Sequence, residues 1–213
     1  VDIEHDKVRV DLVFRMCQLF AEGHNNTMQN LLRDQSRFGV RVVNNLIAVG
    51  LKYLQVIGKN EKTLRAMTGE DSIRLVSTLD FFTEVTQGPC VENQALLAES
   101  ILLDTCSTLM WTTFKIGAKI NAREVNSMKS AGVAIMLALI EGRSDLMVHN
   151  MLATKLEPQI VRNRLVEVYK TYQISLEKHD GDLSGDWDDL LLEEGFGILK
   201  LIQSLTSNHA VTD

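Results

Sequence analysis

Proline is nearly absent from this chain, and long apolar runs are missing. The 213 residues include two prolines and 13 glycines, which argues against a Gly/Pro-rich β protein and favours long helices joined by short links. The longest apolar run, residues 131–140, has ten residues, well short of the roughly twenty that a membrane-spanning helix needs. We therefore expect no transmembrane segment in this sequence.

Cysteine is scarce as well, and basic residues are outnumbered. Cys17, Cys90 and Cys106 are scattered without a CxxC pair, which fits reduced thiols in a cytosolic setting better than a disulfide framework or a zinc site. The net charge of −6 and a pI near 5.4 make nucleic acid or an anionic membrane surface poor default partners.

Apolar residues recur at helical spacing along almost the whole chain. Leu12, Met16, Leu19 and Phe20, for example, lie on one side of a helix. No segment shows strand alternation bounded by hairpin turns. The pattern predicts helices over residues 6–22, from 26 onward, and over 40–57, 61–67, 72–87, 92–98, 99–119, 122–142, 144–153, 156–178 and 188–207.

Helices of this length with short links predict an all-α fold, an armadillo- or HEAT-like solenoid of antiparallel helix pairs. No clean sequence repeat supports it, and a closed helical bundle is the alternative. We expect a helical solenoid domain over residues 1–178, an acidic linker over 179–189 and a C-terminal helix, 190–213, that continues the solenoid. The chain starts at Val1 without a signal sequence, so we expect a piece of a longer protein.

Residues 83–94 combine a helix end, a Gly-Pro stop and the start of a second helix. Proline cannot continue a helix, so Gly88 is expected as the C-cap and Glu84 falls in the last helical turn. A carboxylate there lies beside unpaired carbonyls, at the unfavourable end of the helix dipole. Glu22, just before Gly23, ends an earlier helix in the same way.

Glu22 and Glu84 are therefore our candidate cation ligands. Calcium takes six to eight oxygen ligands, so two carboxylates with helix-end carbonyls would supply about half of a site. Water or a partner segment would supply the rest. The alternative is that both are ordinary solvated helix-end glutamates.

A second candidate is an acidic loop over residues 180–188, which superficially matches an EF-hand. The loop has acceptable residues at five ligand or turn positions, but Leu191 stands where a bidentate glutamate is needed. The alternative is an acidic linker that caps the last helix. The matching residues are Asp180, Asp182, Ser184, Gly185 and Asp188.

No catalytic constellation accompanies the remaining polar residues. His24 is expected to make a turn contact, because no triad pattern surrounds it, and His149 and His179 are expected to be structural. Arg33, Arg37 and Arg41 could bind an anion or form a solvated basic edge. We predict that the chain is not an enzyme.

Three segments stand out when taken together. They are residues 12–35, which contain Glu22-Gly23-His24-Asn25-Asn26, residues 79–94, which contain Thr83-Glu84 and Gln87-Gly88-Pro89-Cys90, and residues 136–143, which end in Glu141-Gly142-Arg143. In this order and spacing they resemble the RIH-associated region of intracellular calcium-release channels, the inositol trisphosphate receptors and ryanodine receptors. The chain departs from that pattern over residues 34–71 and at Val85.

The resemblance implies a helical solenoid in the cytoplasmic part of a homotetrameric channel, at the cytoplasmic face of the endoplasmic reticulum membrane. Its partners would be other domains of the same channel chain and neighbouring subunits. In this family a regulatory Ca²⁺ site uses one glutamate from each of the first two motifs, matching Glu22 and Glu84, and a ligand from a segment near the pore. Agonist binding belongs to another domain, so this region should not bind inositol trisphosphate.

The resemblance favours an inositol trisphosphate receptor-like regulatory domain. A ryanodine-receptor-like domain and a helical interaction scaffold without its own ligand are the alternatives. An uncharacterised enzyme ranks last. If Glu22 and Glu84 lie together in one acidic site, the regulatory domain is favoured over the scaffold.

Overall fold

The computed structural model describes residues 9–36, 39, 44–143, 145–178 and 186–209, and most of these residues are in helices, with no strand among them. This confirms the prediction of an all-α fold. The helices are α1 Val10–Ala21, α2 Asn26–Arg33, α3 Leu46–Ile57, α4 Glu61–Arg65, α5 Gly69–Thr86, α6 Val91–Ala98, α7 Leu102–Trp111, α8 Ala122–Ile140, α9 Met147–Lys155, α10 Pro158–Lys178 and α11 Asp186–His209.

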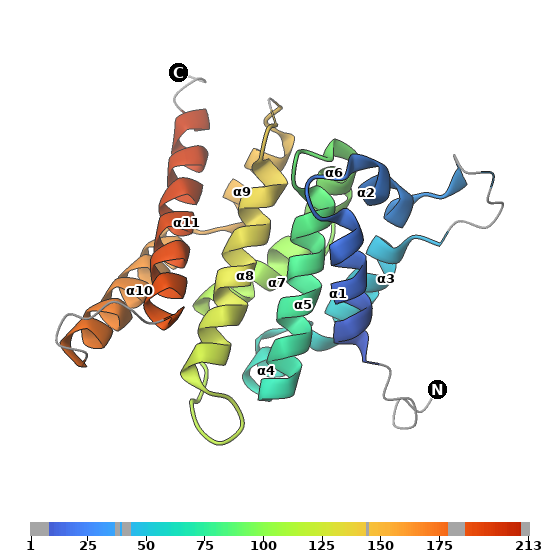
Figure 1. The fold of residues 1–213 in the computed structure, drawn as a ribbon. Helices are drawn as coiled ribbons and strands as arrows, with labels where there is room; N and C mark the ends of the chain where they lie inside the picture. The colour runs from blue at the N-terminus through green and yellow to red at the C-terminus, as the bar shows by residue number, and fades with distance from the viewer. Residues whose placement is uncertain (1–8, 37–38, 40–43, 144, 179–185, 210–213) are drawn as a thin grey trace.

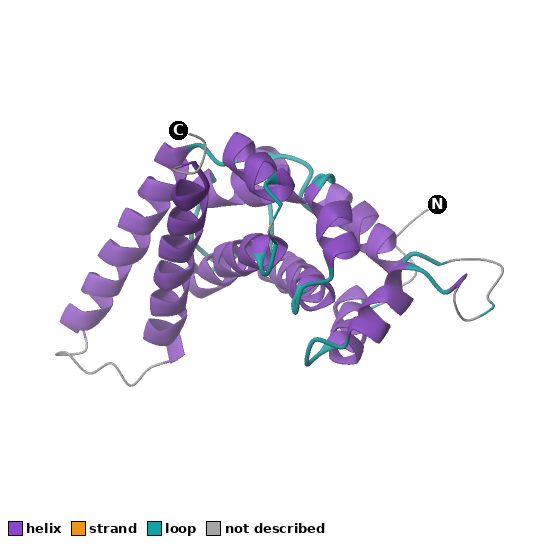
Figure 2. Cartoon of the chain, turned by 90° about the horizontal axis from the view of Figure 1, so that it is seen from above, coloured by secondary structure: helices purple, strands orange, loops and turns teal. Residues whose placement is uncertain are grey.

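The helices stack as an open solenoid. The long helices α1, α5, α8 and α11 lie side by side in chain order, and each packs against the next (Figure 1). A short helix (α2, α6 or α9) follows each of the first three at one end of the layer, and a return helix (α3, α7 or α10) then runs back behind it. Seen from above, the units form a curved row from α1–α3 to α10 and α11 (Figure 2).

Side-chain caps start the two central helices. The Thr68 side chain accepts from the Asp71 N–H while Asp71 accepts from Thr68, and Asn121 and Glu124 form the same reciprocal capping box at α8. These caps satisfy backbone donors that the first helical turn leaves unpaired. They therefore fix where α5 and α8 begin.

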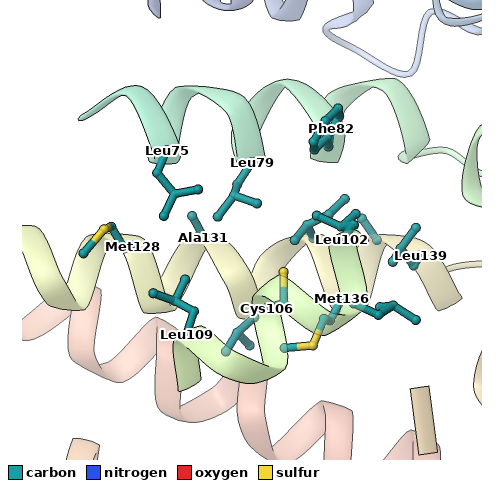
Figure 3. Packing of buried hydrophobic residues seen from close by; sticks show 14 of the residues in the cluster. Leu75, Leu79, Phe82, Leu102, Cys106, Leu109, Met128, Ala131, Met136 and Leu139 are labelled. Atoms are coloured by element: carbon teal, nitrogen blue, oxygen red, sulfur yellow. The ribbon is translucent and has the colours of Figure 1, made fainter. Parts of the chain in front are cut away.

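The core lies between the long layer and the return helices. Leu75 and Leu79 of α5 face α8, and α7 closes the core from behind (Figure 3), whereas Phe81 and Phe82 of α5 pack toward α1 and α3. Burial of this apolar surface stabilises the stack by roughly 25 cal/mol per Å² removed from water. The labelled residues at this junction are Leu75, Leu79, Phe82, Leu102, Cys106, Leu109, Met128, Ala131, Met136 and Leu139.

Two predicted helices are longer than the observed ones by more than two residues within the described ranges or at their ends. The helix predicted over 99–119 ends at Trp111, because the β-branched Thr112 and Thr113 and then Gly117 disfavour helix, and the following loop accepts a hydrogen bond at Lys119 O from Gly69 N (2.8 Å). In the segment predicted over 40–57, the described helix begins at Leu46, because the Asn45 side chain caps it.

The C-terminal helix α11 begins at Asp186, within the stretch expected as linker, and packs on α8, α9 and α10. Residues 179–185 lie outside the described residues, so the division into 1–178, 179–189 and 190–213 stays a prediction. Cys17, Cys90 and Cys106 are all buried and unpaired, and no described helix is long and apolar enough to cross a membrane.

Candidate functional site

Glu22 lies in the turn that joins α1 to α2. It is the C-cap of α1 (φ −52°, ψ 147°), Gly23 follows with φ 71°, and Asn25 N donates back to Ala21 O (3.3 Å) across the turn. A positive φ is strained for most residues, which is why glycine occupies position 23. The turn leaves the Glu22 side chain exposed.

Glu84 is half-buried in the last turn of α5, as predicted. The C-cap is Gln87 (φ −60°, ψ 148°), one residue before the Gly88 that was predicted. Gly88 follows it with φ 81°, and Cys90 N donates to Thr86 O (3.0 Å) across this turn, as Asn25 N does to Ala21 O across the first. Pro89 then prevents the helix from resuming.

The fold brings these two turns together. The His24 side chain lies so close to Gly88 that a Cβ at Gly88 would overlap it. Burial raises the pKa of Glu84 above its ordinary value, and the negative charge of Glu22 raises it further, while His24 and Arg15 oppose the rise. The two predicted carboxylates are therefore close enough to repel each other.

A carboxylate that the sequence did not single out lies on the same helix. Asp80 precedes Glu84 by one turn, on the side of α5 that Arg15 of α1 approaches. Burial raises the pKa of Asp80 to about 6, with Arg15 opposing the rise and Glu84 adding to it. Asp80 stands four residues before Glu84 and directly before the buried Phe81 and Phe82. This spacing was the sequence signal that could have identified Asp80.

Buried amides hold the end of α5 in place. The Gln29 Nε2 atom donates to Glu84 O (2.7 Å) and Gln87 O (2.8 Å), and Asn93 Nδ2 donates to Val85 O (2.7 Å) and Gln29 O (3.2 Å). The bonds to Glu84 O, Val85 O and Gln87 O satisfy carbonyls at the end of α5 that have no partner within the helix. Gln29 and Asn93 therefore fix the backbone that carries Glu84.

Arg33 extends this network. Its guanidinium donates to Asn93 Oδ1 and to Asn30 Oδ1 (2.6 Å). Arg33, one of the three arginines predicted to form an anion site or a basic edge, therefore hydrogen-bonds two side-chain amides. Arg37 and Arg41 lie outside the described residues. The four residues of this network, Gln29, Asn30, Arg33 and Asn93, all lie in the motif segments. Their hydrogen-bond partners include backbone atoms, which residue spacing in the sequence does not reveal.

The same brace recurs one unit further along. The Gln94 Nε2 atom donates to Ala138 O (2.8 Å) and Glu141 O (2.9 Å) at the end of α8, as Gln29 does at the end of α5. Each glutamine is the fourth residue of its short helix. In both, the Oε1 atom is buried without a hydrogen-bond partner among the described residues.

The turns interlock in the same repeated way. Gly142 has φ 65° and packs against Pro89, just as Gly88 packs against His24. The Glu141 carboxylate accepts from Gly88 N (3.4 Å). The third motif segment therefore builds another copy of this turn, and the structure shows a repeat that the sequence alone does not display.

In a second acidic cluster, Glu167 and Glu194, both carboxylates are paired with arginine or lysine side chains. Buried Arg164 of α10 donates to both carboxylate oxygens of buried Glu194 (2.7 Å each), and to Asn126 Oδ1 (3.0 Å), and pairs with Glu167 (2.8 Å). Lys129 of α8 also reaches Glu167 (3.4 Å). This network ties α8, α10 and α11 together, and its acids already have protein partners.

The described residues do not complete a metal site by themselves. Carboxylate oxygens are the ligands that calcium prefers, so Glu22 and Glu84 fit in kind. Within the described ranges, however, no three His, Cys, Asp or Glu side chains are grouped so that they could hold a metal ion. Calcium binding at Glu22 and Glu84 stays a prediction that needs ligands from elsewhere.

The remaining candidates contribute no site within the described structure. Most of the EF-hand-like loop, and His179, lie outside the described residues. His149 Nδ1 lies 3.3 Å from Asp145 O, a contact with the residue one turn before it.

Comparison with known proteins adds an independent finding. The model of the RyR and IP3R Homology associated family matches residues 4–110. The inositol 1,4,5-trisphosphate receptor itr-1 of Caenorhabditis elegans is 33% identical over 141 residues, which make up 64% of this chain and 5% of that receptor. The chain thus spans only 5% of the length of this relative. The family match includes both turns that carry Glu22 and Glu84.

Proposed function

The chain belongs to the RyR and IP3R Homology associated family, and we propose that it is a cytoplasmic regulatory and coupling domain of a calcium-release channel. The similarity to an inositol 1,4,5-trisphosphate receptor favours that type over a ryanodine-receptor type. The domain would contact other domains of one larger channel chain and neighbouring subunits, at the cytoplasmic face of a calcium-store membrane. We assign it no catalytic role.

The convergence of Glu22 and Glu84 is the observation that supports this proposal most. They come from different units of the solenoid, yet the negative charge of Glu22 raises the pKa of Glu84. Carboxylates that repel each other gain most when a divalent cation arrives between them. Calcium is the cation that such hard oxygen ligands suit.

The proposed mechanism couples calcium to domain orientation. The two glutamates would supply part of the coordination, and a segment near the pore would supply the rest. A ligand shifts a conformational equilibrium only by its different affinity for the two states. A site divided between this solenoid and another segment has that difference, because the site is complete only in one relative orientation.

The test is thermal unfolding of the chain in calcium, beside Glu22→Gln and Glu84→Gln variants. A ligand that binds only the folded state stabilises it by RT ln(1 + [L]/Kd). With a Kd of about 5 mM and about 50 mM calcium this is about 1.4 kcal/mol, or a rise in Tm of about 3–5 °C. We expect either substitution to abolish the rise.

Magnesium at equal ionic strength and Glu157→Gln, an exposed carboxylate in the α9–α10 link, are the controls. Magnesium should give a smaller rise, because it demands a tighter octahedral shell. A rise that persists in both glutamate variants would refute the assignment to Glu22 and Glu84. No rise at all would leave two interpretations, a calcium site that forms only with ligands from another segment or a scaffold without its own ligand, since the described residues offer no third protein ligand.

A further inference from the structure

The junction of α1 and α5 holds a cation that the proposed calcium site does not use. Arg15 of α1 is exposed, and it forms no hydrogen bond or ion pair with any residue that the structure describes. Asp80 of α5 is half-buried and likewise has no such partner within the described ranges. By contrast, Arg74, earlier on α5, is paired with Glu70 and Asp71. The charge of Arg15 is therefore not fixed to one carboxylate.

A ring contact sets the relative height of the two helices. Phe14 of α1 stacks on Phe81 of α5 with the ring centroids 5.3 Å apart, and the helices lie side by side and run in the same direction (Figure 1). Arg15 follows Phe14, and Asp80 precedes Phe81. At a rise of about 1.5 Å per residue, Arg15 lies about 3 Å above Asp80 and about 3 Å below Glu84 along the helix axes. Arg15 therefore stands between the two carboxylates in height.

The charges at this junction act on one another as this placement requires. The positive charge of Arg15 opposes the rise in pKa that burial causes at Asp80 and at Glu84. Arg15 and Glu84 are the charged groups that act on Asp80, and Glu84 also faces Glu22 and His24. Arg15 thus acts on both carboxylates across the junction.

The corresponding positions of α8 carry no charge. Arg15 and Asp80 occupy the same position, seven residues before the C-cap of their helices, where α8 has Ala134. Three residues before the C-cap, α5 has Glu84 and α8 has Ala138. The helix α8 nevertheless packs on α5 as closely as α5 packs on α1. The stacking of long helices therefore does not require these charges, which leaves a role in ligand binding.

We propose that Arg15 is the counter-cation of the α1–α5 junction and that its charge sets the affinity of the Glu22–Glu84 pair for calcium. This inference rests on the proposed calcium function. Without calcium, Arg15 offsets the charges of Asp80 and Glu84. When calcium binds between Glu22 and Glu84, the guanidinium repels the ion, and it stays charged at any pH at which the protein is folded. Arg15 therefore lowers the affinity for calcium without contacting the ion.

Calcium titrations followed by Tm test the proposal. A unit charge about 8 Å from a divalent ion at a half-buried site, the usual distance between packed helices, changes the Kd about fourfold in about 0.15 M salt. We expect the Kd of Arg15→Gln for calcium to be lower than that of the wild type by this factor. Arg15→Lys keeps the charge and should restore the wild-type Kd. Because Arg15 is exposed, both variants should fold, which circular dichroism checks.

Arg123→Gln is the matched control, because Arg123 is an exposed arginine in the first turn of α8 and its loss changes the net charge equally. Its Kd should equal that of the wild type. At about 0.5 M salt the Debye length is shorter than the separation, so the gain of Arg15→Gln should fall below about twofold. Adding Glu84→Gln to Arg15→Gln should abolish the calcium response, because Arg15 acts on the Glu22–Glu84 pair.

Equal Kd values in the wild type and Arg15→Gln would overturn the proposal and leave the calcium function, which Glu22→Gln and Glu84→Gln test, standing. An equal gain in Arg15→Lys would also overturn it, since the effect would then depend on side-chain shape and not on charge. So would the absence of any response in Arg15→Gln up to about 50 mM calcium. A response that appears only in Arg15→Gln would support both proposals. A gain that survives Glu84→Gln would refute both.

Discussion

Two junctions between long helices hold carboxylates in opposite ways. At the junction of α8, α10 and α11, the buried Glu194 meets the Arg164 guanidinium through two hydrogen bonds of 2.7 Å. Burial works against the Arg164 charge, but Glu194 raises the pKa of Arg164 above its usual value. At the junction of α1 and α5, Glu84 faces Glu22, and Asp80 lies one turn away.

The difference separates structural acids from acids that are open to a ligand. A carboxylate whose charge is matched by a buried arginine has its lone pairs occupied, and removing either partner leaves an uncompensated charge. Carboxylates that repel one another cost the fold stability and can recover it from a cation or a proton. We therefore expect substitutions at the two junctions to have opposite signs.

Glu194→Ala should have the largest effect. It leaves Arg164 buried with only part of its partners, and breaking a buried pair in this way typically costs about 3–5 kcal/mol. In a chain of this length that lowers Tm by about 10 °C. Urea unfolding at pH 7 measures the loss of free energy.

Glu193→Ala is the matched control, since Glu193 is exposed on the preceding position of the same helix. It should change the free energy of unfolding by less than about 0.5 kcal/mol. An equal loss in both variants would mean that helix α11 is sensitive to any substitution there, and the buried pair would have no special role.

Gln29→Met is expected to lower the free energy of unfolding by a smaller amount, about 2 kcal/mol. The substitution keeps the length of the side chain but leaves Glu84 O and Gln87 O without the amide donor, and an unpaired buried acceptor costs about 1–3 kcal/mol. Gln94→Met should cost a similar amount, because Gln94 braces the end of α8 with the same geometry.

The Gln29 and Gln94 side chains are uncharged. The loss in free energy of unfolding of Gln29→Met and of Gln94→Met should therefore be constant between about pH 4 and pH 8. Asn150→Ala, at the fourth position of α9 where the side chain is exposed, should be nearly neutral. Unequal costs for Gln29→Met and Gln94→Met, by more than about 1 kcal/mol, would contradict the equivalence of the two turns.

The sequence predicted most helices because apolar periodicity and capping residues are local signals. It placed Glu22 and Glu84 at helix ends, but their proximity depends on how α1 stacks on α5, which no spacing rule contains. Gln29 and Asn93 received no role, because their partners are carbonyl oxygens that every residue has. The repeat leaves only a weak trace in the sequence: a glycine follows each C-cap residue, and a glutamine stands six residues after Gly23 and after Gly88, but the C-cap residues of α1, α5 and α8 are not all of one type.

Asp80→Asn should stabilise the protein, by about 1–2 kcal/mol at pH 7–8. In the folded chain the pKa of Asp80 is raised to about 6 from an ordinary value of 3.8, so the folded state binds the proton more tightly than the unfolded state. Wild-type stability is therefore lost as pH rises from about 4 to 6, and the magnitude is reduced from the full pKa difference because Asp80 is partly exposed.

The amide cannot ionise, so the gain of Asp80→Asn should vanish near pH 4, whereas Glu99→Gln, at an exposed carboxylate, should show no such dependence. Urea unfolding of both variants from about pH 4 to 8 measures this. A loss of stability at pH 7 in Asp80→Asn would show that Arg15 fully compensates the Asp80 charge, and the α1–α5 junction would then resemble the Arg164–Glu194 pair.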